Sequence, residues 1–339
     1  MKYAVSFLLG LLALMIPSMI ETEEAPIVDG TSVAMVLEQM GEDYLAKKPK
    51  DIKNVSAQIG EDIIKRGFSK RKGQKKSKRQ SKHFVCTSCH NIEREDPDLS
   101  VNDPQARLNY TNEKGLPFLQ ATTLYGAVNR DSFYNGDYEK KYNELVKPAR
   151  NDIREAIQLC AVECAQGRKL HDWEVESILS YFWTIDLKME DLNLSEKEIE
   201  ITNAAVGQSD SIVNSAKKFI KDRYLTASAA TFVLPPEDRK KGYELKGNPA
   251  NGKLIYDNSC LHCHLNMKYS YFHLDNNSMS LNYLRNKAGK FSNHSIYQVI
   301  RYGTYPKHGK KSYMPQYTQE KLSDQQVEDL RAYLVKGDS

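Results

Sequence analysis

Two short segments of the chain carry the residue types best suited to do chemistry. Each is a Cys-x-x-Cys-His pattern: Cys86, Cys89 and His90 in the first, and Cys260, Cys263 and His264 in the second. Two thiols at this spacing lie on one helical turn and can add to the two vinyl groups at one edge of a porphyrin. The histidine that follows is then placed to bind the iron. The sequence therefore predicts two covalently bound haem c groups, with His90 and His264 as iron ligands.

Two other chemistries use closely spaced cysteines. A structural zinc site would need the two pairs to cooperate in one small unit, but they lie far apart in the sequence. A thioredoxin-like redox pair follows a strand and does not need the trailing histidine. The pattern therefore favours haem over both alternatives.

The surroundings of the second pattern predict two helices. One short helix is expected over 253–258, directly before Cys260. A longer helix is expected after Asp324, where apolar side chains recur at helical spacing. Ser323 or Asp324 is a plausible N-cap of this helix.

Residues 241–335 resemble a class I cytochrome c domain. The resemblance implies Met314 as the second iron ligand, whose soft thioether raises the reduction potential. The alternative for Met314 is a methionine that fills a gap in the core. Lys310 and Lys311 lie close enough to compete for the iron in some state.

An internal repeat extends these expectations to the first half. Residues 172–182 align with 324–334, and their apolar positions coincide. The first half should therefore end in a helix near 172–185, with its second iron ligand some ten residues earlier, as Met314 precedes Asp324. That stretch contains no methionine, but it contains Cys160 and Cys164.

A helix is predicted over 152–166, with Gly167 ending it. Four side chains fall on one face at helical spacing: Ile153, Ile157, Cys160 and Cys164. Both thiols should then point toward the haem. The alternative is two small apolar core cysteines, while a disulfide between helical neighbours four apart would be strained.

The first half resembles the thiosulfate dehydrogenase family and the haem-binding component of the sulfur-oxidising complexes. The similarity lies in residues 87–88, 157–160 and 166–170. Gln158 stands where these families favour Asn, and Ala165 where they place Met.

This resemblance implies a cysteine thiolate on the active-site iron, and the matching residue is Cys160. Cys164 has no counterpart there, and the alternatives for the ligand are Cys164, His171, Met189 or an open site. The resemblance also implies a small sulfur oxyanion as substrate, with thiosulfate joined oxidatively to tetrathionate.

A thiolate-bound haem has a lower potential than a methionine-bound one, so electrons should run from the first haem to the second. A dianionic substrate needs cations, and four arginines flank the predicted ligand helix: Arg130, Arg150, Arg154 and Arg168. The alternative for each is a solvated surface charge or a haem propionate partner. The competing functions are a dihaem electron carrier without substrate chemistry and, as a third option, a dihaem peroxidase.

A tract of eight basic residues and no acidic one spans 69–82, although the net charge of the whole chain is only +4. It is either a solvated loop or a docking site for an acidic redox partner, such as another cytochrome or an oxidase, or for an anionic membrane. Nucleic acid is disfavoured as a partner, because export is expected. Lys2 and the apolar run over 4–16 are typical of a secretory signal, so the protein should be periplasmic, with a retained inner-membrane anchor as the alternative.

The predicted fold class is all-α, because no βαβ rhythm and no Gly-x-Gly-x-x-Gly run occurs. Two cytochrome c-type helical domains with long loops should each surround one haem. The predicted organisation is a signal or anchor at 1–20, an N-terminal extension at 21–54, domain one at 55–190, a linker at 191–236 and domain two at 237–339. Helices are expected over 33–47 in the extension and over 55–67 at the start of domain one.

Overall fold

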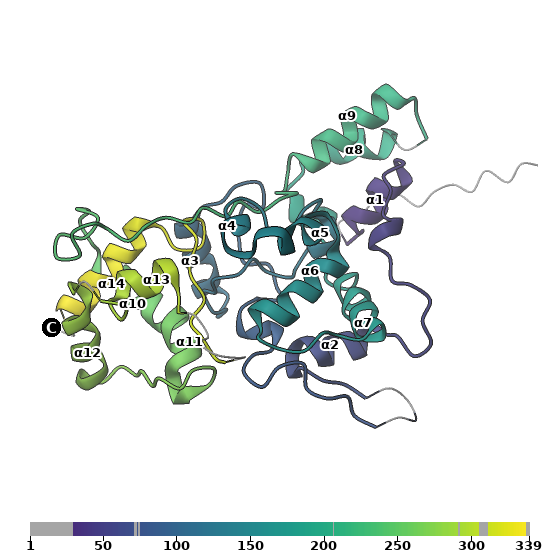
Figure 1. The fold of residues 1–339 in the computed structure, drawn as a ribbon. Helices are drawn as coiled ribbons and strands as arrows, with labels where there is room; N and C mark the ends of the chain where they lie inside the picture. The colour runs from purple at the N-terminus through teal and green to yellow at the C-terminus, as the bar shows by residue number, and fades with distance from the viewer. Residues whose placement is uncertain are drawn as a thin grey trace, which may run out of the picture.

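The computed structural model describes residues 30–70, 73, 75–205, 207–290, 292–304 and 311–336. The predicted signal at 1–20 and Lys310 lie outside the described residues. The described residues form helices joined by long loops, with only isolated β-bridges between extended segments (Figure 1). The predicted all-α class is confirmed. None of the described helices is both long and apolar enough to cross a membrane.

The helices form two groups that lie side by side in Figure 1. The first half contains α1 (Val33–Gln39), α2 (Ala57–Arg66), α3 (Pro104–Glu113), α4 (Tyr138–Tyr142), α5 (Val146–Asn151), α6 (Ile153–Leu159) and α7 (Asp172–Phe182). The connecting region contains α8 (Glu196–Ala205) and α9 (Asp210–Lys221). The second half contains α10 (Pro249–Ile255), α11 (Leu261–His264), α12 (Ser278–Ala288), α13 (Ile296–Tyr302) and α14 (Asp324–Lys336).

Local chemistry sets the ends of the helices that frame the two cysteine patterns. The Ser56 side chain caps α2 by accepting a hydrogen bond from the backbone N–H of Ile59, and Gly67 ends it in the left-handed conformation with φ +76°. Asn248 caps α10, and Pro249 occupies its first turn, where no N–H is needed.

Both halves contain the same close helix crossing. In the first half α2 crosses α7, and a Cβ at Gly60 would lie 1.9 Å from the carbonyl oxygen of Ser177. In the second half α10 crosses α14, and a Cβ at Gly252 would lie 1.9 Å from the carbonyl oxygen of Asp329. Ser177 and Asp329 occupy matching positions in the sequence repeat. The repeat therefore corresponds to one helix-pair geometry that is used twice.

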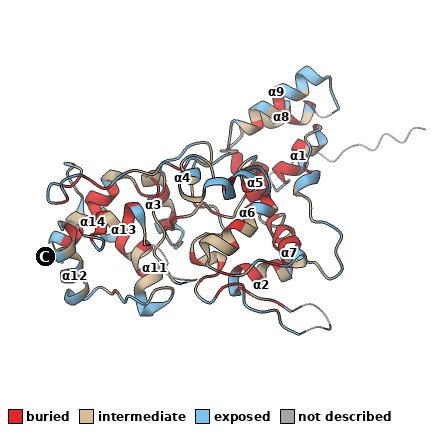
Figure 2. Cartoon of the chain, viewed as in Figure 1, coloured by how far each residue is buried: buried red, intermediate tan, exposed pale blue. Residues whose placement is uncertain are grey.

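The two halves share a hydrophobic core. Leu108 on α3 and Phe118 after it are fully buried, and both belong to the cluster built around α10 and α14. Buried segments of both halves meet in this region (Figure 2). Part of the predicted domain 55–190 thus packs inside the second half.

The predicted N-terminal extension and linker pack against each other. Val36 and Leu37 of α1 are fully buried in one cluster with Ala216 and Ile220 of α9. The helix predicted over 33–47 consists of α1 and a separate short turn at Leu45–Lys47. The region 191–236 therefore contains a helical hairpin, α8 and α9, that covers the N-terminal helix.

The crossings give a stability prediction. Gly60→Ala or Gly252→Ala gains about 1 kcal/mol of helix propensity, but the new Cβ overlaps a backbone carbonyl and forces the helices apart. Overpacking typically costs about 1–3 kcal/mol and can cost more at a backbone contact. We therefore expect each variant to have a lower free energy of unfolding in urea than the parent.

The matched control is Gly289→Ala, at the C-cap of α12. Its φ of −89° suits alanine, and the nearest atom to a Cβ there is 3.7 Å away. Equal stability of the Gly60 and Gly289 variants would contradict the close crossing.

Candidate functional site

The two predicted iron-binding histidines have the same hydrogen-bonded arrangement. His90 Nδ1 lies 2.6 Å from the carbonyl oxygen of Thr122, and His264 Nδ1 lies 2.8 Å from that of Phe272. A carbonyl only accepts, so Nδ1 carries the proton and Nε2 keeps its lone pair. Burial lowers the pKa of both imidazoles, which favours the neutral form. Each histidine is therefore oriented as a metal ligand with a backbone partner behind it.

The cysteines of both patterns suit thioether attachment to a porphyrin. All four are free thiols, and burial raises the pKa of each. Within the part of the chain that the structure describes, no group of three or more His, Cys, Asp or Glu side chains could hold a metal ion. The donor sets thus fit haem, with one histidine ligand each, better than a tetrahedral zinc site.

A large cavity opens beside the first pattern. Cys86, Cys89 and His90 line it, and the space between its walls is about 1650 Å³ with its open mouth included. The rest of its wall is mostly apolar and comes chiefly from the segment 120–142, α6, α7 and the segment 313–318. Size and lining both fit a porphyrin whose iron is bound by His90.

Cys160 and Cys164 both line this cavity, as expected. The predicted helix over 152–166 is not one regular helix: α6 ends at Leu159, and Cys160–Cys164 forms a π-helical turn. Such turns are rare and are often found at functional sites. In this turn both thiols face the same cavity.

The two thiols differ in their environment. Cys164 Sγ lies 3.4 Å from the hydroxyl of Tyr142 and 3.9 Å from that of Tyr134. Its pKa is lowered to about 7, mainly by the hydrogen bond with Cys160 and, against the effect of burial, also by these hydroxyls. The Cys160 pKa is raised, first by its hydrogen bond with Cys164 and then by burial. The two tyrosine hydroxyls thus favour the thiolate form at Cys164.

Only one of the four predicted arginines lines the cavity. Arg130 is held there by the carbonyl oxygens of Thr123 at 2.8 Å and Tyr125 at 3.1 Å, and burial lowers its pKa to about 10. A lysine, Lys141, also lines the cavity and donates to Gln316 at 3.1 Å. No pattern in the sequence singled out Lys141.

The other three arginines contact carboxylates away from the cavity. Arg154 binds Glu176 of α7 at 2.7 Å, Arg168 binds Glu174 at 2.6 Å, and Arg150 lies 3.4 Å from Glu139. Their predicted role in substrate binding has no support from this placement.

Sequence reasoning also missed an aromatic wall. Tyr134, Tyr138 and Tyr142 line the cavity and contact one another, with Tyr138 and Tyr142 stacked at 6.2 Å between ring centroids. Their spacing of four residues was the available signal, because side chains at this interval gather on one side of a helical segment. These rings cover the side of the cavity next to Cys164.

The segment around Met314 touches both sites. Tyr313 lines the first cavity and packs edge-on against Phe84 at 5.8 Å, whereas Met314 packs against the core cluster of the second half, as Cys260 also does. Thr304 fixes the Met314 backbone through two hydrogen bonds of 2.8 Å. Ser312, two residues before Met314, donates to the carbonyl of Tyr269, whose N–H donates to the carbonyl of Cys263. The Met314 segment is thus tied to the second pattern, and Lys311 is exposed.

The two Cys-x-x-Cys-His patterns also lie next to each other. His262, inside the second pattern, lies within reach of the backbone carbonyls of Thr87 and Ser88 in the first. Two porphyrins attached at these patterns would therefore be neighbours.

Comparison with known proteins gives one family. Residues 247–334 match the family described as cytochrome c oxidase, cbb3-type, subunit III. No curated protein and no solved structure matches the chain. The match covers the second Cys-x-x-Cys-His pattern, Met314 and most of α14, and it agrees with the class I cytochrome c domain expected over 241–335. The C-terminal part of this chain is therefore a c-type cytochrome domain, which implies covalently bound haem c and electron transfer to redox partners.

Proposed function

We propose that the chain is a dihaem c-type cytochrome that oxidises a small sulfur anion, such as thiosulfate, and delivers the electrons to a redox partner protein. One haem c would be attached at Cys86 and Cys89 and the other at Cys260 and Cys263. Bound haem supplies one-electron redox chemistry. We further propose export to the periplasm, with residues 1–20 either removed or retained as an inner-membrane anchor.

The observation that supports substrate chemistry is the composition of the first cavity. It brings together His90, the thiols of Cys160 and Cys164, and the half-buried cations Arg130 and Lys141. Arg130 presents a fixed fork of donors suited to an oxyanion. Joining two thiosulfate ions releases two electrons, which matches two one-electron groups in one chain.

The protein side chains would prepare the cavity in three ways. Arg130 and Lys141 attract the anion, the tyrosine wall limits the entry of water, and Cys160 is the proposed thiolate ligand of the first iron. Met314 is the proposed ligand of the second iron, which would place the second site at the higher potential.

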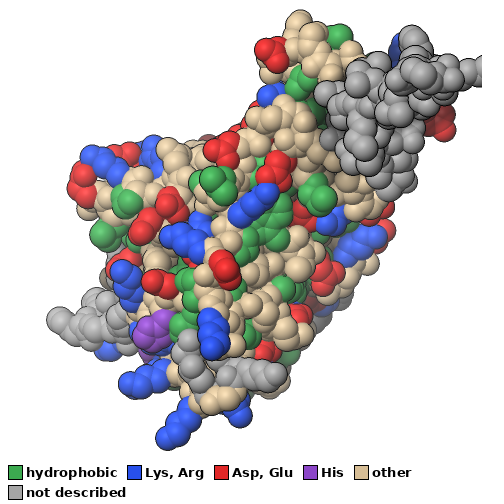
Figure 3. Space-filling model, turned by 90° about the vertical axis from the view of Figure 1, so that its right-hand side faces the viewer, with side chains coloured by type: hydrophobic (Ala, Val, Ile, Leu, Met, Phe, Trp, Pro, Cys, Tyr) green, Lys and Arg blue, Asp and Glu red, His purple; other side chains and the backbone are tan. Residues whose placement is uncertain are grey.

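A second candidate function is a dihaem electron carrier that accepts electrons from a protein. It is favoured by a cationic hollow lined by Lys75, Ser77, Lys78, Arg168, Lys169, His171 and Trp173. Lys and Arg side chains gather at the lower end of the face shown in Figure 3. Arg168 N–H donates to the carbonyl of Gln80, whose side chain donates to the carbonyl of Ala161. Two hydrogen bonds through Gln80 thus link the hollow to the turn that carries the two thiols.

Haem content tests the proposal first. The denatured protein should carry the mass of two haem groups, and Cys86→Ala/Cys89→Ala should retain one. The mirror variant Cys260→Ala/Cys263→Ala is the control and should also retain one. A parent protein with a single haem at Cys260 and Cys263 would contradict the dihaem arrangement.

Ligation of the first iron gives a second test. Cys160→Met should raise the midpoint potential of the first haem, because a neutral thioether replaces an anionic thiolate, and remove any thiolate charge-transfer band. Cys164→Ser is the matched control and should keep that band. Loss of the band in the Cys164 variant alone would assign the ligand to Cys164.

Reduction of the haems by thiosulfate in the parent protein would support the enzyme function over the electron-carrier function.

The cationic hollow gives a third test. Lys75→Gln/Lys78→Gln/Lys169→Gln should slow electron transfer with an acidic redox protein at low salt, and the difference from the parent should fade as salt screens the charges. The control changes three exposed lysines elsewhere: Lys114, Lys197 and Lys246. Equal rates for both triple variants at every ionic strength would exclude docking at the hollow.

A further inference from the structure

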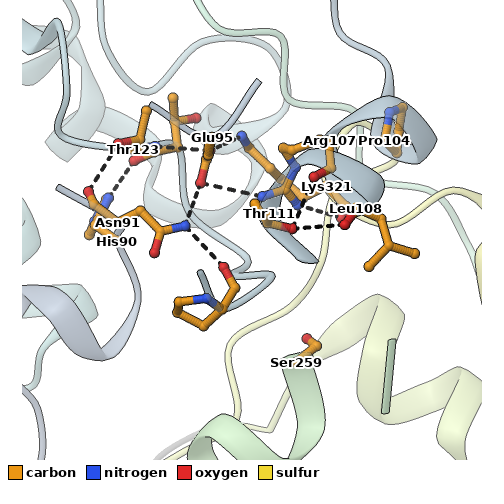
Figure 4. A network of polar contacts seen from close by, with 12 residues as sticks. His90, Asn91, Glu95, Pro104, Arg107, Leu108, Thr111, Thr123, Ser259 and Lys321 are labelled. Carbon is orange, nitrogen blue, oxygen red and sulfur yellow. Dashed lines mark hydrogen bonds and ion pairs between the residues drawn. The ribbon is translucent and has the colours of Figure 1, made fainter. Parts of the chain in front are cut away.

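One buried carboxylate lies where the two halves meet. Glu95 is fully buried and accepts hydrogen bonds from Asn91 Nδ2 at 2.9 Å, from Thr123 N–H at 3.1 Å and from Lys321 Nζ at 3.1 Å (Figure 4). Arg107 Nη1 lies 3.5 Å from Glu95 Oε2, the oxygen that also accepts from Asn91. Three other chain segments, those of Arg107, Thr123 and Lys321, therefore converge on the Glu95 side chain.

Two of these contacts hold the surroundings of His90. Asn91 directly follows His90, and Thr123 directly follows Thr122, whose carbonyl accepts the hydrogen bond from His90 Nδ1. Glu95 thus holds the chain on both sides of that hydrogen bond. Its removal would loosen the histidine and its acceptor together.

The cations of this network tie His90 to the second half. Lys321, in the loop before α14, is 7% exposed and also lines the first cavity. Arg107, 1% exposed, donates from Nη2 to the backbone carbonyl of Lys321 at 2.9 Å and lies over the ring of Phe118. The second half therefore contributes a charged group to the wall of the first site.

The network keeps Glu95 ionised. Burial alone would raise the pKa of Glu95, but Lys321 and Arg107 lower it to about 2. Glu95 brings a negative charge to the residues beside His90, and Lys321 brings a positive charge to the wall of the first cavity. The two side chains therefore act on the first site with opposite electrostatic signs.

We propose that Glu95 and Lys321 are positioning residues that set the redox potential of the first haem site, and that the second half completes this site through Lys321. This inference rests on the proposed haem at Cys86 and Cys89. Oxidation leaves the iron site more positive by one charge. A nearby negative charge therefore favours the oxidised state, and a nearby positive charge favours the reduced state.

The variants have opposite expected effects. Glu95→Gln should raise the midpoint potential of the first haem, and Lys321→Met should lower it. We expect each variant to change the one-electron equilibrium constant at least tenfold, which corresponds to about 59 mV. Glu95→Gln/Lys321→Met should return to an intermediate value. A merely structural role would move both single variants in the same direction or in neither.

The experiment is a spectroelectrochemical titration of the full protein, with the haem content measured on the same sample. The matched control is Glu328→Gln, because Glu328 is another buried carboxylate, bonded to Tyr297 at 2.6 Å in the second half. It should leave the first haem's potential unchanged. Lys321→Arg keeps the charge and should restore the parent value.

The outcomes of this experiment distinguish failure of the proposed dihaem function from failure of the positioning role. If the parent carries no haem at Cys86 and Cys89, the proposed dihaem function fails. If that haem is present but its one-electron equilibrium constant changes less than tenfold in Glu95→Gln and Lys321→Met, or its potential shifts with the same sign in both, the positioning role is wrong. If Glu95→Gln fails to fold because it leaves two buried cations without their carboxylate, Lys321→Met and Lys321→Arg decide alone. In both of these Lys321 variants, Glu95 keeps its contact with the Arg107 guanidinium.

Discussion

The contact on which the rest of the structure depends is the backbone-to-backbone approach at Gly60 and Gly252. Any side chain there would overlap a carbonyl oxygen of the partner helix. Because the helices touch without side chains between them, their separation is fixed more rigidly than in ordinary helix packing. In the second half α10 leads toward the Cys-x-x-Cys-His pattern, and α14 follows the segment with Met314. The crossing thus fixes the distance between the segment that carries the Cys-x-x-Cys-His pattern and the segment that carries Met314.

The two halves are interdependent. Leu108 and Phe118 come from the first half but lie in the core of the second, whereas Tyr313 and Lys321 come from the second half and line the first cavity. Glu95 of the first half accepts a hydrogen bond from Lys321 of the second, so it lies where the two halves meet. A change in the packing of the second half therefore reaches His90 in the first half through a few hydrogen bonds.

Sequence reasoning succeeded where the signal was local. Helices were expected over 55–67, near 172–185 from the sequence repeat, and after Asp324 from apolar periodicity, and α2, α7 and α14 lie there. The face shared by Cys160 and Cys164 was also expected, although the turn there is π-helical. The arginines show the limit of this approach. Arg154 and Arg168 lie near the ligand segment in sequence, but each contacts a glutamate on α7, because an ion pair depends on which helices pack together.

By itself, the sequence determined the two Cys-x-x-Cys-His patterns, the helical class and the repeat of the helix that closes each half. These depend on residues a few positions apart and on covalent chemistry that tolerates little variation in spacing. Only the tertiary structure decided that Arg130 and Lys141 face the cavity, that tyrosines surround Cys164, and that Lys321 reaches Glu95 from more than 200 positions away. Such contacts arise when distant segments share one core, and no periodicity within either segment encodes them.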